Sequence, residues 1–318
     1  MELVRGVHNL SAKHTGCVLT IGKFDGVHLG HQAVLKRLKQ KANEMQLPSA
    51  VMVFEPQPEE VFAPIDAPAR LSTLRDKATL LAEQGIDRLI CIRFDKRFAA
   101  LSPEAFIRDL LVEKLGIQYL VVGDDFRFGR KRAGDFAMLL DAGKREQFDV
   151  VNTASFRLHD SRISSTAIRE SIEQNEFEIA HEMLGRPFSI SGKVIHGNKK
   201  GRTIGFPTAN VLLNRCRSPL QGVFAVTVTL GTIRYFGVAN IGSRPTIDGT
   251  RVQLEVHIFK YSGDLYGKRI DVTPISKIRD EIKFNSFDEL KKQISLDAEK
   301  ALTLLTALFD DVITESEN

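Results

Sequence analysis

The sequence predicts an α/β protein: an N-terminal domain built on a doubly wound parallel sheet, then a small antiparallel β-barrel domain with a C-terminal helix. Three observations lead to this prediction. Up to about residue 185, short apolar runs alternate with amphipathic helical segments, which is typical of parallel sheets covered by helices. After that point, apolar and polar residues alternate singly between turns that contain glycine, which is typical of antiparallel strands. The length of 318 residues fits two domains of roughly 150 residues each.

In the first half, strands and helices are expected to follow one another in strict alternation. The expected strands are residues 17–22, 49–55, 88–94 and 118–123, and the expected helices are 31–45, 72–85 and 102–116. Val34, Leu35 and Leu38 form an apolar stripe on the first helix, and Ser102 with Pro103 is a typical helix start. Because parallel sheets bind ligands at the carboxyl ends of their strands, chemistry is expected directly after residues 20–22 and 120–123.

The second half is expected to supply the barrel strands from residues 188–197, 222–231, 233–242, 251–259 and 267–274. A closing helix is expected from Ser286. Its predicted apolar face consists of Phe287, Leu290, Ile294, Ala301, Leu304, Leu305 and Leu308.

Composition and charge exclude several classes of protein. No apolar run reaches the roughly 18 residues of a membrane span, and the first residues lack the apolar core of a signal peptide, so a soluble, cytoplasmic protein is expected. Three cysteines without a C-x-x-C pattern argue against a disulfide framework and a structural zinc site. A net charge of +4 fits small phosphate-bearing ligands as well as nucleic acid, and by itself it does not decide between them.

The segment T-I-G-K-F-D-G-V-H-L-G-H lies between the first expected strand and the first expected helix. Gly26 and Gly30 leave room for a phosphate near the backbone, and His28 and His31 are three residues apart at the helix start. A helix N-terminus with two imidazoles suits negative charge that develops on a phosphate. Two simpler alternatives stay open: a capped helix with solvent-facing histidines, or a zinc site through Asp25, His28 and His31.

Two further segments support a phosphate site. Ser164, Ser165 and Thr166 stand at an expected helix start with Arg169 one turn later, which suits a triphosphate, although an ordinary helix cap has the same pattern. After residue 123, Asp124 and Asp125 offer oxygen ligands for Mg²⁺. The basic residues that follow, Arg127, Arg130, Lys131 and Arg132, could equally be a solvated charged loop.

The segment G-K-V-I-H-G-N-K-K-G-R-T-I-G-F-P-T-A-N indicates a second phosphate-handling site, although the chain has no P-loop motif. It contains Gly192, Lys193, Gly197, Lys199, Lys200, Gly201, Arg202 and Gly205. Thr208 and Asn210 share one face of an extended chain and offer neutral oxygens to Mg²⁺. On 251–259, Glu255 alternates with core residues and could accept the proton of an attacking hydroxyl. The simpler alternatives are a glycine-rich turn and a solvent-facing glutamate.

Three motifs, G-K-F-D-G-V-H-L-G-H, V-V-G-D-D-F-R-F-G and I-S-S-T-A-I-R, resemble the adenylyltransferase module of the prokaryotic bifunctional riboflavin kinase/FAD synthetases. That module belongs to the H-x-G-H nucleotidyltransferase superfamily. The resemblance implies transfer of AMP from ATP to FMN, giving FAD and pyrophosphate. It implies ATP contacts, with His28 and His31 as catalytic residues, from Gly22, Phe24, Asp25, Gly30, Ser164, Ser165, Thr166 and Arg169. It implies flavin contacts from Phe54, Phe62, Asp125 and Phe128, with Asp125 also near phosphate and metal.

The motifs G-F-P-T-A-N, G-V-A-N-I-G-S-R-P-T, L-E-V-H and D-L-Y-G resemble the riboflavin kinase module of the same family. The resemblance implies that ATP phosphorylates riboflavin to give FMN and ADP. It implies Glu255 as the catalytic base and Thr208 with Asn210 as the Mg²⁺ site. It further implies ATP contacts from Gly192, Lys193, Gly201 and Arg202, and a flavin contact from Arg279.

Together the two resemblances imply an FMN adenylyltransferase domain at 1–185 and a riboflavin kinase domain at 186–318. Mg²⁺ is the implied cofactor, and neither nucleic acid nor a membrane is an expected partner. Two alternatives stay open: a nucleotidyltransferase for another phosphorylated acceptor, and a flavin- or nucleotide-binding module without catalysis. The oligomeric state is not predictable from these motifs.

Overall fold

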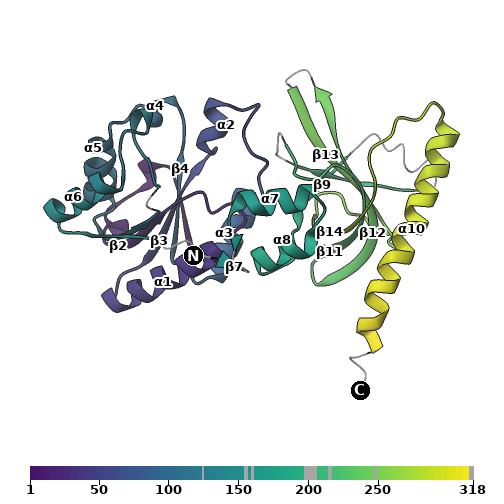
Figure 1. Cartoon of the computed structure of the whole chain (residues 1–318), viewed down its shortest axis with the longest axis horizontal. Helices are drawn as coiled ribbons and strands as arrows, with labels where there is room; N and C mark the ends of the chain where they lie inside the picture. The colour runs from purple at the N-terminus through teal and green to yellow at the C-terminus, as the bar shows by residue number, and fades with distance from the viewer. Residues whose placement is uncertain are drawn as a thin grey trace. The chain divides into compact units, whose positions relative to one another are not determined.

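The computed structural model describes residues 1–123, 125–153, 157–158, 161–196, 206–213, 217–246 and 249–314. The chain forms two compact units (Figure 1): Met1–Pro68 with Ser72–Ser165, and Ala69–Leu71 with Thr166–Asn318. We call them the α/β unit and the barrel unit. The functional boundary expected at residue 185 stays a prediction.

The α/β unit is built on a six-stranded parallel sheet with the strand order β1-β4-β3-β2-β5-β6. The strands are β1 (Glu2–Arg5), β2 (Cys17–Ile21), β3 (Ser49–Glu55), β4 (Arg88–Arg93), β5 (Ile117–Val122) and β6 (Asp149–Asn152). The chain runs outward from β2 to β4 and then returns to the other side of β2 for β5. This reversal confirms the doubly wound sheet. The two edge strands, β1 and β6, were not among the predicted strands.

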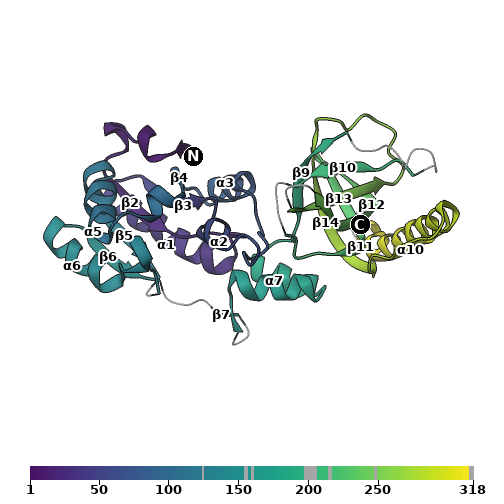
Figure 2. The same cartoon turned by 90° about the horizontal axis from the view of Figure 1, so that it is seen from above.

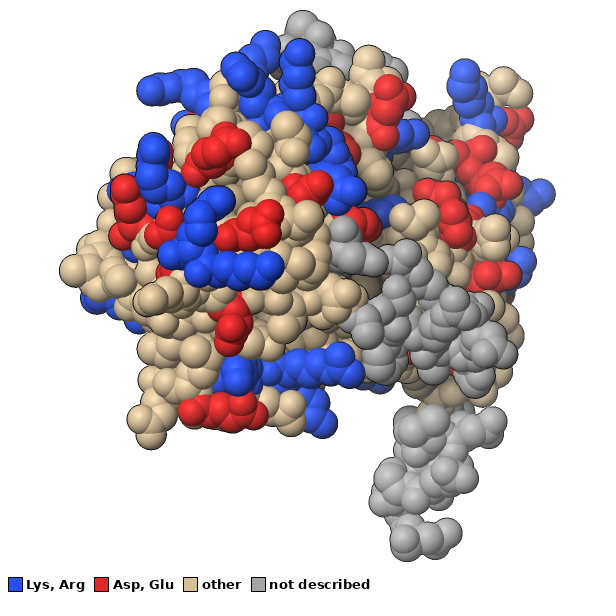
Figure 3. All heavy atoms as spheres, turned by 60° about the vertical axis from the view of Figure 1, so that its left-hand side comes forward, with Lys and Arg blue, Asp and Glu red and all other residues tan. Residues whose placement is uncertain are grey.

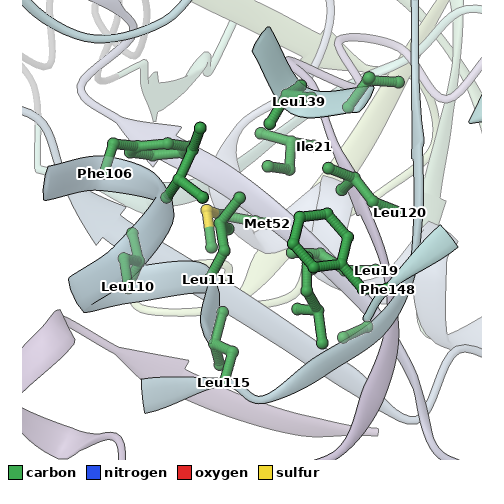
Figure 4. Close-up of a cluster of buried hydrophobic side chains, with 14 of the residues drawn as sticks. Leu19, Ile21, Met52, Phe106, Leu110, Leu111, Leu115, Leu120, Leu139 and Phe148 are labelled. Atoms are coloured by element: carbon green, nitrogen blue, oxygen red, sulfur yellow. The ribbon is translucent and has the colours of Figure 1, made fainter. Parts of the chain in front are cut away.

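Helices cover both faces of this sheet because its strands are apolar on both sides. Along β2, Val18 packs into a cluster with α1 (Leu29–Met45) and α3 (Leu74–Glu83), whereas Leu19 packs into a cluster with η3 (Phe106–Lys114) and α6 (Phe136–Glu146). Figure 4 shows the second cluster, in which Met52 lies beside Leu111 and Leu19 lies beside Phe148. The helices of this unit are α1 (Leu29–Met45), α2 (Pro58–Phe62), α3 (Leu74–Glu83), α4 (Lys96–Ala99), α5 (Pro103–Ala105) and α6 (Phe136–Glu146), with short 3₁₀ turns η1 (Val7–Asn9), η2 (Ala12–His14) and η4 (Arg130–Arg132).

The helix expected at 102–116 begins as predicted but changes type. The Ser102 Oγ accepts a hydrogen bond from the Ala105 N–H at 3.1 Å, and Pro103 occupies the first turn of α5. From Phe106 to Lys114 the chain continues as a π-helix, η3. Within this π-helix, Phe106, Ile107, Leu110 and Leu111 are buried in the core.

The barrel unit contains a closed barrel with the strand order β10-β13-β12-β11-β14-β9, and β9 pairs with β10 to close it. All of its pairs are antiparallel, which confirms the predicted architecture. The strands are β9 (Ile190–Ile195), β10 (Ala209–Leu212), β11 (Gly222–Leu230), β12 (Ile233–Thr246), β13 (Gly249–Ile258) and β14 (Arg269–Arg279). Sequence patterning missed β10 as a strand. The helices α7 (Ser165–Glu173) and α8 (Phe177–Leu184) precede the barrel, after a small ladder of β7 (Arg157–Leu158) and β8 (Ser161–Arg162).

The helix α10 (Phe287–Thr314) lies along the outside of the barrel (Figures 1 and 2) and confirms the predicted closing helix. Its buried stripe differs from the predicted one. Ala301 and Leu305 are fully buried and Phe309 packs on Phe236, whereas Phe287 and Leu308 are 52% and 53% exposed. The reason is angular. At about 100° per residue, Leu308 lies about 60° from the centre of the stripe formed by residues 301, 305 and 309, and therefore at the edge of the buried face.

No helix among the described residues is both long enough and apolar enough to cross a membrane. Cys17 and Cys91 are buried, and burial raises the pKa of the Cys17 thiol to about 12. Cys216 lies outside the described residues.

Candidate functional site

The two segments expected to carry the chemistry of the α/β unit lie side by side. β2 pairs with β5, so the loops that begin at Gly22 and Gly123 leave the same edge of the sheet from neighbouring strands. This is the point where the strand order reverses, and doubly wound sheets bind their ligands in the crevice at such a point. The sequence could not predict this adjacency, because it depends on the strand order.

The loop after β2 is held in an unusual backbone conformation. Phe24 and Val27 have φ angles of +46° and +41°, although both carry bulky side chains and Val27 is β-branched. Gly26 has φ +81°, where glycine is favoured. Both bulky side chains are buried, so packing holds the loop in this conformation. Strain of this kind is concentrated at functional loops.

The two histidines meet at the start of α1. The His28 Nδ1 accepts a hydrogen bond from the His31 backbone N–H at 3.3 Å, so His28 is the N-cap of the helix. In the neutral form, this bond places the ring proton of His28 on Nε2. The two rings stack with centroids 3.6 Å apart, and Phe24 packs on His31 with centroids 4.9 Å apart. The predicted shared face is therefore present, and the alternative with solvent-facing histidines fails because His28 is buried.

The ring nitrogen Nδ1 of His31 is buried and can form a hydrogen bond to a ligand. Within the part of the chain that the structure describes, its Nδ1 has no hydrogen-bond partner. Burial lowers the pKa of His31 well below its ordinary value, and the neighbouring His28 and Lys77 act in the same direction. His31 is thus a neutral imidazole at pH 7. Its unpaired buried nitrogen fits a hydrogen bond to a phosphate group.

Lys77 lies close enough to His31 to affect it electrostatically, and the sequence reasoning did not single it out. It lies on α3, only 1% of its surface is exposed, and its charge acts on His31. Lysine is almost never fully buried without a partner. The sequence pattern could have indicated its burial. In the segment L-R-D-K-A-T-L-L, Lys77 occupies a core-facing position between Leu74 and Leu81.

Asp25 anchors the loop instead of facing a ligand. Its fully buried carboxylate accepts hydrogen bonds from the Ser72 N–H at 3.0 Å and the Ser72 Oγ at 3.1 Å, and the same Oγ accepts from the Gly26 N–H at 2.9 Å. The zinc alternative is therefore not supported. Across the described residues, no three His, Cys, Asp or Glu side chains converge on a metal position.

The serine-threonine motif is tied to this loop through one hydrogen bond. The Ser165 Oγ donates to the Asp25 carbonyl at 2.9 Å. Ser164 is half-buried and Thr166 is exposed. Arg169 donates through Nε to the Ala69 carbonyl, within the barrel unit. In the loop after β5, Asp125 is exposed, and Asp124 lies outside the described residues.

The three phenylalanines expected to contact flavin belong to one aromatic chain. Phe54 contacts Phe94 and Phe98 at 5.7 Å between ring centroids, and Phe94 contacts Phe62 at 5.8 Å. From Phe98 the chain continues through Phe106, Phe128 and Phe126. The environments differ. Phe62 is 64% exposed and Phe128 is 6% exposed within the hydrophobic core, so Phe62 is the residue in position to stack on a ligand.

In the barrel unit, the expected metal ligand and the expected base are direct neighbours. Asn210 on β10 stands opposite Glu255 on β13. Gln253 joins them: its Nε2 donates to the Asn210 Oδ1 at 2.7 Å and to the Glu255 Oε1 at 2.7 Å. Val252 and Leu254 are buried, and Glu255 is half-buried on the opposite face, as predicted.

Two further contacts shape this cluster. The His257 ring nitrogen Nδ1 lies 2.8 Å from the Pro207 carbonyl, so Nδ1 carries the proton and donates. This bond holds the segment that leads to Thr208. On the neighbouring strand β12, Asn240 stands opposite Glu255. Its Nδ2 donates a hydrogen bond to the Glu281 carboxylate at 3.3 Å. The sequence analysis did not single out Glu281.

A pocket of about 330 Å³ opens beside Thr208. Val194, Pro207, Thr208, Val256, Tyr261 and Tyr266 contribute to its lining. Tyr266 also stacks on His196 with centroids 3.8 Å apart. The lining combines apolar side chains and two tyrosine rings with the polar residues Thr208, Ser262 and Asp264, a mixture that suits an aromatic ligand carrying polar groups.

The remaining expected positions have clear local surroundings. Arg279 donates from Nε and Nη2 to the buried Asp297 carboxylate at 2.7–3.0 Å, so its guanidinium is held by α10. Gly192 lets β9 approach β10, because a Cβ there would lie 2.2 Å from Val211. Lys193 is exposed. Gly201 and Arg202 lie outside the described residues.

Comparison with known proteins finds a different family model on each half of the chain. A family model described as FAD synthetase matches residues 10–167, and one described as riboflavin kinase matches residues 184–305. The chain is 54% identical over 299 residues to the bifunctional riboflavin kinase/FMN adenylyltransferase of Escherichia coli strain K12, which covers 93% of this chain and 96% of that relative. It belongs to the bifunctional riboflavin kinase/FMN adenylyltransferase family.

Other members of this family align over a similar length. The Haemophilus influenzae relative is 52% identical over 302 residues, covering 95% of this chain and 98% of the relative. A solved structure described as a macrolide-efflux protein from Streptococcus pneumoniae has a TM-score of 0.75 at 29% identity, covering 93% of this chain and 97% of that one. This likeness confirms the fold. Both activities named for the family transfer phosphorus groups from a nucleotide, and such reactions imply a divalent metal.

Proposed function

We propose that this chain makes FAD from riboflavin in two steps, with FMN as the product of the first and the substrate of the second. The barrel unit phosphorylates riboflavin with ATP to give FMN and ADP. The α/β unit then adenylylates FMN with a second ATP to give FAD and pyrophosphate. One observation carries the proposal: each family signature stands at a site whose side chains suit its reaction, the histidine pair at the β2–β5 edge and the Asn210–Glu255 pair in the barrel.

In the kinase step, Glu255 is the group that accepts the proton. The 5′-hydroxyl of the ribityl chain transfers its proton to the Glu255 carboxylate as its oxygen bonds to the γ-phosphorus of ATP. The bond between that phosphorus and the β,γ-bridging oxygen breaks, and ADP leaves. The pocket beside Thr208 supplies a position for an aromatic ring of a substrate.

In the adenylyl step, no base is required because the FMN phosphate is already an anion at neutral pH. One of its oxygens bonds to the α-phosphorus of ATP, and the bond to the α,β-bridging oxygen breaks to release pyrophosphate. His28 and His31 lie at the positive end of α1, where they stabilise the charge that develops on the phosphates. The Ser165 hydroxyl donates to the Asp25 carbonyl, so Ser165 lies beside the same loop.

We propose Mg²⁺ as the metal, with Thr208 and Asn210 as its protein ligands in the barrel unit. The donor set fits: both offer neutral oxygens, and the Asn210 Oδ1 keeps a second lone pair beside the one used by Gln253. When bound with ATP, Mg²⁺ supplies charge neutralisation of the transferred phosphate.

The extents of the two functional domains and the flavin contacts are part of the same proposal. The family matches at 10–167 and 184–305 support a synthetase domain at 1–185 and a kinase domain at 186–318. The exposed Phe62 and its aromatic neighbours support a flavin position near α2. On the face that Figure 3 presents, basic and acidic side chains are interspersed, which does not favour a long polyanion over small phosphates. We place the enzyme in the cytoplasm, where its substrates ATP and riboflavin meet.

Chromatographic separation of flavins tests the proposal. Purified protein with riboflavin, ATP and Mg²⁺ is expected to form FMN first and FAD later. The double variant H28A/H31A should still form FMN but no FAD, and E255A should form FAD only when FMN is supplied. If neither riboflavin nor FMN is converted, the binding-module alternative is favoured. If a folded single-site variant loses both activities, the assignment of two separate sites is wrong.

A further inference from the structure

Gln253 uses both hydrogens of its side-chain amide inside the kinase cluster. Its Nε2 donates to the Asn210 Oδ1 and to the Glu255 Oε1, each at 2.7 Å. An ionised carboxylate only accepts hydrogen bonds, so Glu255 requires the NH₂ end of Gln253 to face it. The orientation of the Gln253 amide is thus set by the charge on Glu255.

This orientation in turn sets the orientation of Asn210. An asparagine side chain can turn its oxygen and its nitrogen into each other's place with almost no change in shape. With the Gln253 NH₂ group opposite, the flipped form of Asn210 would bring two NH₂ groups together without an acceptor. Only the form with Oδ1 facing the Gln253 NH₂ group makes this hydrogen bond. Since Gln253 uses one lone pair of the Asn210 Oδ1, the second lone pair of this oxygen is available to a cation.

We infer that Gln253 is a positioning residue of the kinase site, which fixes Asn210 with its oxygen toward the metal and holds the Glu255 carboxylate in register with it. The inference deepens the proposed kinase function and rests on it. Gln253 itself touches no reacting atom. It acts through the two residues that do, as outer-shell hydrogen bonds orient the ligands of many metal sites.

The position of Gln253 argues against a role in the core alone. Its strand neighbours Val252 and Leu254 are buried, whereas Gln253 is half-buried on the face that carries Glu255. Leucine has nearly the same volume and keeps the strand but donates no hydrogen bond. Q253L thus separates the hydrogen bonds from the packing. Gln221, exposed just before β11, offers a matched control as Q221L.

The test uses the full chain and two kinds of measurement. Binding of Mn²⁺ in the presence of ADP is followed by electron paramagnetic resonance, in an H28A/H31A background so that the signal reports the barrel. Kinase and adenylyltransferase rates are measured in chains with intact histidines. Q253L is expected to weaken Mn²⁺ binding and to lower the kinase kcat, each by about 10- to 100-fold, with adenylyl transfer and thermal unfolding unchanged. Q221L should match the parent chain in every measurement.

A second substitution tests the orientation argument itself. Aspartate has two equivalent carboxylate oxygens, so either orientation of its side chain presents an oxygen. In an N210D background, Q253L should therefore lower the affinity for Mn²⁺ much less than it does in the parent chain. Equal losses in both backgrounds, or Mn²⁺ binding unaffected by Q253L, would overturn the inference. So would a joint loss of both activities with a lower unfolding temperature, since that outcome indicates a structural role. If the parent chain makes no FMN, the proposed function is wrong. The Mn²⁺ binding data then show independently whether Gln253 positions Asn210.

Discussion

The hydroxyl of Ser72 is expected to stabilise the α/β unit and to fix the conformation of the loop after β2. Ser72 stands just before α3 and is buried. Its Oγ donates to the fully buried Asp25 carboxylate at 3.1 Å and accepts from the Gly26 N–H at 2.9 Å. The substitution Ser72→Ala removes both bonds while leaving the Ser72 N–H bond to Asp25 in place.

The expected cost follows from the two bonds. A hydrogen bond to a buried charged group contributes about 1.5–3 kcal/mol, and a neutral one about 1 kcal/mol. Ser72→Ala should therefore lower the free energy of unfolding of the α/β unit by about 3 kcal/mol. For a domain of this size, that corresponds to a fall of about 6–12 °C in unfolding temperature. Because the loop carries the histidine pair, a displacement of about 1 Å should also lower adenylyl transfer about 100-fold.

Calorimetry and the two flavin assays test this reasoning, with Ser102→Ala as the matched control. Ser102 caps α5 by accepting from the Ala105 N–H, and its side chain also bonds the exposed Glu104, so the loss of this helix cap should cost only about 1 kcal/mol and leave adenylyl transfer unchanged. Riboflavin phosphorylation should be unaffected in both variants. The reasoning is wrong if Ser72→Ala is no more destabilising than Ser102→Ala, or if it keeps full adenylyltransferase activity.

Three further outcomes are expected. Phe62→Ala should raise the KM for FMN with a stability change under about 0.5 kcal/mol, whereas Phe128→Ala should cost about 3–5 kcal/mol in urea unfolding; the opposite pattern would exchange their roles. Asp297→Leu should destabilise the barrel unit by about 3 kcal/mol by stranding the Arg279 guanidinium, and adding Arg279→Met should recover most of that loss; no recovery would show that the pair is not the cause. Because burial lowers the pKa of His31, its contribution to stability is complete above about pH 6.5 and is lost as the pH falls below that value, by at most about 1.4 kcal/mol per pH unit. The difference in unfolding free energy between the parent and H31N should therefore shrink in acid, and a constant difference would contradict this account.

Local features of the chain were predictable because they depend on near neighbours in sequence. The periodicity of β2, α1 and β13 and the cap at Ser102 follow from a few adjacent residues, and all appear in the structure. The histidine pair could be predicted in the same way, since residues three apart at a helix start share a face. The buried stripe of α10 was predicted less well, because the barrel decides which side of a long helix is covered.

The sequence by itself thus determined the fold class, the family signatures and the residue types of both sites. Only the tertiary structure decided which strands became neighbours, and hence that the loops after β2 and β5 share one edge. It also decided that Phe62 is exposed while Phe128 is buried, and that Gln253 lies between Asn210 and Glu255. The physical reason is that burial and hydrogen bonding are set by residues distant in the chain, and periodicity carries no record of which distant strands will pair.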